Sequence, residues 1–168
     1  EKITKIYLIG DSTMMDYDQY RADYLTSIYP LAGWGQYFQV LIDRQTITAL
    51  DFLIKTDSVL VDNRAIGGRS TRSFFEEGRW AKVYQELHPG DLVMIQFGHN
   101  DATLERPLRY VTPEAYKEYI RLFVSQSREK GAIPIVVTPV SRNELWTDGK
   151  LEAQHGEYYK SAVEVSQE

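Results

Sequence analysis

Four short apolar runs divide the chain, and the longer stretches between them carry apolar residues at helical spacing. The runs are residues 5–9, 58–62, 92–97 and 133–138. Pro134, near the start of the fourth run, is compatible with a strand because a first strand residue need not donate to the ladder. Short apolar runs that alternate with helical stretches predict an α/β domain with a mostly parallel sheet.

Helices are predicted between and after these strands. The clearest begins at Thr112-Pro113-Glu114, which combines a capping residue, a proline at the first helical position and an acid in the first turn. Its apolar residues recur at helical spacing until a glycine at position 131. Residues 33–43, 79–87 and 157–168 predict further helices. Residues 16–30 and 46–57 are interpreted as surface insertions.

The last predicted helix, residues 157–168, is followed by no further strand. A βαβ repeat places a fifth strand next. We therefore expect residues 1–168 to form a single domain that is incomplete at its C-terminus.

Composition and charge narrow the function classes. The chain is 43% hydrophobic and 26% charged, which is typical of a globular protein. Its formal net charge of -5 argues against a nucleic-acid partner, since such proteins carry a basic stripe. No apolar run approaches the roughly 18 residues of a spanning helix, so no membrane partner is expected. The absence of cysteine excludes disulfides, thiolate zinc sites and cysteine nucleophiles.

Three short segments of polar residues and glycines each follow a predicted strand. They are residues 10–13 (GDST), 63–70 (NRAIGGRS) and 98–101 (GHND). Open parallel sheets place their sites at the carboxyl ends of strands. We therefore expect all three segments to lie along one edge of the sheet.

Each segment offers one candidate chemical group. The Ser12 hydroxyl would sit where a helix begins, and backbone N–H groups there favour negative charge. The glycine pair that ends at Gly68 allows a left-handed turn or close approach of the backbone, so its N–H is a candidate oxyanion donor. The Asn100 amide is a neutral donor suited to the same task. Each group also has a purely structural explanation. Ser12 can be a helix cap, and the glycine pair can belong to an ordinary loop. The Asn100 side chain can make hydrogen bonds to the backbone of its own loop.

Taken in order, the three segments resemble the first three sequence blocks of the SGNH (GDSL) hydrolase superfamily, and most closely those of its rhamnogalacturonan acetylesterase-like branch. Residues 34–36 (WGQ) and 138–140 (TPV) are also similar to that branch. The resemblance implies a three-layer αβα sandwich with a mostly parallel, flavodoxin-like sheet. It further implies ester hydrolysis without metal or organic cofactor, with Ser12 as nucleophile. The oxyanion hole would comprise the N–H groups of Ser12 and Gly68 and the side chain of Asn100.

The general base is where the sequence departs from this family. The family takes its base from a late Asp-x-x-His block, and no such block occurs here. His88 precedes a Pro-Gly turn, His99 belongs to the third segment, and His155 has no aspartate three residues before it. We expect the base to come from a C-terminal segment removed from this chain, with a natural non-catalytic relative as the alternative. The 168 residues alone should then be a poor esterase.

The function implied by the resemblance is removal of acetyl groups from pectin, in particular from rhamnogalacturonan. Arg69, Arg72 and Arg106 are candidates to meet uronate carboxylates, although each is also explained as a solvated surface charge. The expected partner is an acetylated oligo- or polysaccharide, and a polymer substrate favours an extracellular or periplasmic location over the cytoplasm.

Three alternatives remain open. One is a lipase- or thioesterase-type esterase of the same superfamily. The second is a non-catalytic carbohydrate-binding domain that uses some of the 12 tyrosines. The third is a flavodoxin-like phosphate binder at residues 10–13, which lacks any Gly-x-Gly-x-x-Gly or phosphate-loop motif.

Overall fold

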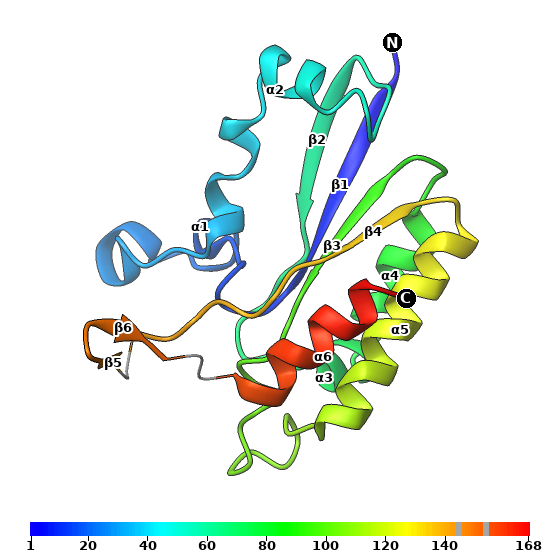
Figure 1. The fold of residues 1–168 in the computed structure, drawn as a ribbon. Helices are drawn as coiled ribbons and strands as arrows, with labels where there is room; N and C mark the ends of the chain where they lie inside the picture. The colour runs from blue at the N-terminus through cyan, green and yellow to red at the C-terminus, as the bar shows by residue number, and fades with distance from the viewer. Residues whose placement is uncertain (144–145, 153–154) are drawn as a thin grey trace.

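Four parallel strands form the sheet at the centre of the molecule (Figure 1). The computed structural model describes residues 1–143, 146–152 and 155–168. The strands are β1 (Ile3–Gly10), β2 (Ser58–Asn63), β3 (Leu92–Gln96) and β4 (Ile133–Val136), in the order β2-β1-β3-β4. All neighbouring pairs are parallel. The four predicted strands and the α/β class are therefore confirmed.

Helices on one face of the sheet make the first outer layer. They are α3 (Thr71–Glu76), α4 (Arg79–Glu86), α5 (Pro113–Glu129) and α6 (Gly156–Ser166), which Figure 1 shows together on one side. The predicted start of α5 is confirmed, because the Thr112 side chain accepts a hydrogen bond from the Ala115 N–H and Pro113 is the first helical residue. The helices predicted at residues 79–87 and 157–168 are α4 and α6. The sequence patterns missed α3.

The opposite face is covered by a less regular layer. It contains α1 (Tyr17–Tyr20), a π-helical turn (Tyr24–Ile28), two 3₁₀ helices (Trp34–Tyr37 and Gln39–Leu41) and α2 (Arg44–Ala49). Side chains of α2 and of the residues after it pack beneath the sheet, and Ile54 is buried there. The interpretation of residues 46–57 as a surface insertion is therefore wrong.

The helix predicted over residues 33–43 is also wrong, since the segment forms the two short 3₁₀ helices instead. The start of this segment lies against the loop after β1. The Gly33 and Trp34 N–H groups donate to the carbonyls of Met15 and Thr13, at 3.2 and 2.9 Å. A Cβ on Gly33 would lie only 2.4 Å from the Met15 carbonyl oxygen. Close backbone contact with this loop therefore fixes where the segment begins.

Alternate residues of β1 supply two hydrophobic cores. Tyr7 and Ile9 pack with the helices of the first layer, while Ile6 and Leu8 pack with the second layer. This alternation follows from the period of two along a strand. Burial on both faces is typical of parallel sheets, and the result is the three-layer αβα sandwich that the resemblance implied.

A small antiparallel hairpin precedes α6. Its strands are β5 (Trp146–Thr147) and β6 (Lys150–Leu151). Asp148 and Gly149 join them with φ angles of 50° and 74°. Asp-Gly with two positive φ angles is the preferred sequence of a two-residue hairpin turn. Asp148-Gly149 was therefore a sequence signal for this hairpin, which the sequence analysis did not predict.

Candidate active site

The three segments singled out from the sequence lie together at the carboxyl edge of β2, β1 and β3. These strands are neighbours in the sheet, and each segment follows one of them directly. A Cβ placed on Gly67 would lie 3.7 Å from the Ser12 Cβ, so the first and second segments are in contact. The Asn100 Nδ2 donates to the Arg69 carbonyl at 3.0 Å, which joins the third segment to the second.

Ser12 lies in a tight turn rather than at the start of a helix. The Asp11 Oδ1 accepts hydrogen bonds from the Thr13 N–H at 2.9 Å and from its hydroxyl at 2.8 Å. The N–H groups of Met14 and Met15 donate to the Asp11 carbonyl. The next helix, α1, starts only at Tyr17. The expectation that a helix N-terminus stabilises charge on Ser12 is therefore wrong, and any such stabilisation must come from the turn and the neighbouring loops.

The side chain of Asp11 holds this turn from the buried side. Asp11 is 1% exposed, and its Oδ2 has no hydrogen-bond partner among the residues that the structure describes. Burial raises the pKa of the Asp11 carboxyl, against the lowering effect of its bonds to Thr13. The Ser12 hydroxyl itself is half-buried and makes no hydrogen bond to any residue that the structure describes.

Gly68 adopts the left-handed conformation that a glycine pair allows. Its φ is +78°. The turn closes through a hydrogen bond of 3.3 Å from the Arg69 N–H to the Ile66 carbonyl. Further back, the Asn63 side chain donates to the Met14 carbonyl at 2.9 Å and so ties the end of β2 to the turn that carries the serine.

Asn100 has its side-chain amide held at both ends. The Nδ2 donates to the Arg69 carbonyl, and the Oδ1 accepts a long hydrogen bond of 3.4 Å from Nη1 of Arg109. This arrangement fixes which end of the amide carries the donors. Within residues 1–143, 146–152 and 155–168, Nδ2 donates only to Arg69, so one of its N–H groups is left to donate.

Behind Asn100, Asp101 connects the third segment to α3. Its Oδ1 accepts from the Thr71 N–H at 3.0 Å and from the Thr71 hydroxyl at 2.5 Å. Asp101 is fully buried, and its Oδ2 has no hydrogen-bond partner in the described part of the chain. Burial raises the pKa of its carboxyl to about 7. The bond pair anchors the start of α3, and with it the loop that carries Gly68.

None of the three histidines is hydrogen-bonded to Ser12 among the described residues. His88 is exposed in the turn before β3, as predicted. The His99 and His155 rings stack with centroids 4.3 Å apart. Their Nε2 atoms lie 2.6 and 3.1 Å from the Val140 carbonyl oxygen. Among the described residues, no hydrogen bond joins Ser12 to a histidine ring, and the structure supplies no support for His155 as the base.

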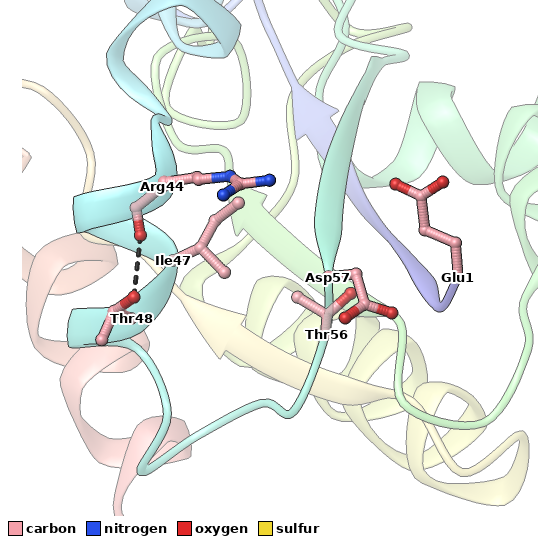
Figure 2. Close-up of a pocket in the computed structure, with 6 residues that line it drawn as sticks. All are labelled: Glu1, Arg44, Ile47, Thr48, Thr56 and Asp57. Atoms are coloured by element: carbon pink, nitrogen blue, oxygen red, sulfur yellow. Dashed lines mark hydrogen bonds between the residues drawn. The ribbon is translucent and has the colours of Figure 1, made fainter.

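Two cavities differ in their relation to this edge. One, of about 360 Å³, is bordered by Gly68, Arg69 and Arg109 and therefore adjoins the site. The other, of about 570 Å³, is shown in Figure 2 and is lined by Glu1, Arg44, Ile47, Thr48, Thr56 and Asp57. These residues lie before β1 and β2 or in α2, so this cavity is at the amino ends of the strands, away from Ser12.

Two kinds of feature are absent from the part of the chain that the structure describes. No group of three or more His, Cys, Asp or Glu side chains there could hold a metal ion. The described helices are too short or too polar to cross a bilayer.

The family model and the curated relatives that match this chain agree on one family. The model of the GDSL-like lipase/acylhydrolase family matches residues 8–168. The rhamnogalacturonan acetylesterase RhgT of Bacillus subtilis is 37% identical over 158 residues, which are 94% of this chain and 58% of that protein. The probable rhamnogalacturonan acetylesterase YesY of the same organism is 37% identical over 138 residues, 82% of this chain and 54% of that protein. The chain thus spans little more than half the length of these curated relatives.

Solved structures show the same fold. Protein YxiM from Bacillus subtilis superposes with a TM-score of 0.74 at 28% identity, over 98% of this chain and 41% of that one. A variant of an acetyl xylan esterase from Geobacillus stearothermophilus gives a TM-score of 0.63 at 19% identity, over 98% of this chain and 72% of that one. The second likeness is evidence of fold alone.

Proposed function

Because the chain belongs to the GDSL-like lipase/acylhydrolase family, we propose that it carries the nucleophile half of a serine esterase that removes acetyl groups from a pectin-like polysaccharide. The observation that carries the proposal is the convergence of the serine, glycine and asparagine segments at one edge of the sheet. Gly67 adjoins Ser12, and the Asn100 amide is bonded to the residue after Gly68. The relatives named rhamnogalacturonan acetylesterase support the choice of acyl group and polymer.

In the proposed reaction, the Ser12 Oγ attacks the acetyl carbonyl carbon and forms a tetrahedral intermediate. Its negative oxygen is bound by the N–H groups of Ser12 and Gly68 and by the Asn100 Nδ2. Collapse of the intermediate breaks the bond to the sugar oxygen, which leaves as a hydroxyl with the proton that the base took from Ser12. Water then gives a proton to the base and attacks the acetylated serine, and acetate leaves as the base returns that proton to the Ser12 Oγ.

Both attacks require a base at the nucleophilic oxygen. No histidine is hydrogen-bonded to Ser12 among the described residues, so we expect these 168 residues by themselves to be a weak esterase. Since a polymer substrate is not imported intact, we also propose an extracellular or periplasmic location.

The experiment is acetate release from acetylated pectin by the full-length protein, with and without Ser12→Ala. Ser125→Ala is the matched control, because Ser125 is exposed on α5 and its hydroxyl only bonds to a backbone carbonyl of its own helix. Acetate release that is lost in Ser12→Ala and kept in Ser125→Ala supports the proposal. Asn100→Ala should lower kcat by about 10²–10³-fold.

Two outcomes would contradict the assignment in different ways. A folded protein that binds the polysaccharide and releases no acetate would be a non-catalytic relative. A strong preference for long acyl chains over acetate on nitrophenyl esters would indicate the lipase-type alternative instead.

A further inference from the structure

Arg109 lies against both of the proposed oxyanion donors outside Ser12. It belongs to the loop between β3 and α5, and no motif in the sequence singled it out. A Cβ on Gly68 would lie 3.0 Å from Nη2 of Arg109 and 3.1 Å from its Cζ, so the guanidinium covers this glycine closely. Its Nη1 donates to the Asn100 Oδ1 at 3.4 Å.

Arg109 also lines the cavity of about 360 Å³ beside the site. The lining consists of two arginines, two glutamates and three further residues: Gly68, Arg69, Ser73, Glu76, Glu77, Leu108 and Arg109. The cavity therefore combines an open volume with charged groups next to the proposed site of acyl transfer.

Most of these charges neutralise one another. The Arg69 Nε lies 3.1 Å from the Glu77 Oε2, which also accepts from Arg79. The Arg72 Nε lies 2.8 Å from the Glu76 Oε1. Two of the three arginines that the sequence suggested as uronate ligands are thus already paired with carboxylates.

Arg109 differs from them. In the described ranges, no carboxylate lies within ion-pair distance of its guanidinium, and its one hydrogen bond is the long contact to the neutral Asn100 amide. It is half-buried, so solvent screens its charge less than that of an exposed side chain. The chain's net charge of -5 provides no general attraction for an anion, so capture of one depends on such a local cation.

We propose that Arg109 is a substrate-binding residue that receives a uronate carboxylate in this cavity, and that it selects acidic over neutral polysaccharides. The planar guanidinium offers two parallel N–H groups that match a carboxylate. A uronate carries its carboxylate on the same sugar ring as its acetylated hydroxyls. A carboxylate on Arg109 would therefore hold the ester close to Gly68 and Asn100. The inference takes its substrate class from the proposed function.

The test measures binding, which requires no base. Calorimetry compares the full-length protein with Arg109→Gln and with Arg128→Gln, using unacetylated trigalacturonate and its carboxyl-reduced, neutral analogue. Arg128 is the matched control, because it is exposed on α5 and does not line this cavity. We expect Arg109→Gln to weaken trigalacturonate binding about tenfold or more. Arg128→Gln should bind as the wild type does, and the neutral analogue should bind all three proteins equally weakly.

Three results would overturn the inference: equal trigalacturonate binding by wild type and Arg109→Gln, an equal loss of both ligands in Arg109→Gln, or no preference of the wild type for the acidic ligand. If Arg109→Gln does not fold, Arg109→Lys replaces it, since lysine keeps the charge and loses the two-pronged geometry. That variant should then bind trigalacturonate more weakly than the wild type, and equal binding would overturn the inference. Acetate release is measured separately, so trigalacturonate binding through Arg109 without acetate release would refute the proposed function and leave this inference standing.

Discussion

Substitution of Gly68 by alanine tests the contact between the glycine turn and Arg109. The left-handed backbone of Gly68, at φ +78°, costs a residue with a Cβ about 1–2 kcal/mol. The new methyl group would also lie 3.0–3.3 Å from three atoms of the Arg109 guanidinium. Those atoms end a flexible side chain and can move by a few tenths of an ångström, so the crowding displaces Arg109 rather than the backbone.

The free energy of unfolding should therefore fall by the backbone cost and little more. The hydrogen bond from Arg109 to Asn100 is long and partly exposed, and its loss contributes about 0.5 kcal/mol. The larger consequence is for binding, because a displaced guanidinium no longer faces the cavity in the same position. We expect Gly68→Ala to lose about 1–2 kcal/mol of stability and to weaken binding of trigalacturonate.

Gly78→Ala is the matched control. Gly78 precedes α4 with φ +71°, and a Cβ there would meet nothing within 4 Å. It carries the backbone cost without the crowding. Urea denaturation followed by circular dichroism should give the two variants stabilities within about 0.5 kcal/mol of each other, and only Gly68→Ala should bind trigalacturonate more weakly. A Gly68→Ala loss that exceeds the control by more than about 1 kcal/mol, or unchanged binding, would refute the reasoning.

Three further predictions concern the framework of the site. Burial raises the pKa of Asp101 to about 7, so the folded protein keeps a proton that the unfolded chain releases near pH 4. The free energy of unfolding should therefore fall by up to about 4 kcal/mol as the pH rises from 4 to 7. If urea titrations give wild type and Asp101→Asn the same dependence of this free energy on pH, the prediction is wrong. Gln96→Leu removes the oxygen that accepts a hydrogen bond from the Trp34 Nε1 at 2.7 Å, and the free energy of unfolding should fall by about 2 kcal/mol. An unchanged melting curve would contradict this prediction. Gly35→Ala places a Cβ 2.4 Å from a backbone carbonyl oxygen and should lower the stability by about 3 kcal/mol. Gly67→Ala is the control and should cost less than about 1 kcal/mol, because the nearest atom to its Cβ is 3.4 Å away. Comparable losses in these two variants would refute the steric argument.

The strands and the best-capped helix could be predicted from local patterns, because those patterns encode burial directly. Residues 6–9 (IYLI) are apolar without interruption, as a strand buried on both faces requires. The Thr-Pro-Glu start of α5 specifies its own cap. The single helix predicted for residues 33–43 failed because the segment also contacts the loop after β1 and strand β2, and no local pattern contains such contacts.

The sequence by itself determined where the four strands lie along the chain, the α/β class and the three segments that carry candidate chemistry, because short-range periodicity and residue type are sufficient for those inferences. Only the tertiary structure decided which groups touch one another. It showed that Ser12 lies in a turn without a helix behind it, that Arg69 and Arg72 are paired with glutamates, and that Arg109 lies over Gly68 and Asn100. The physical reason is that such contacts depend on loop conformations fixed by packing between distant segments, which no local pattern contains.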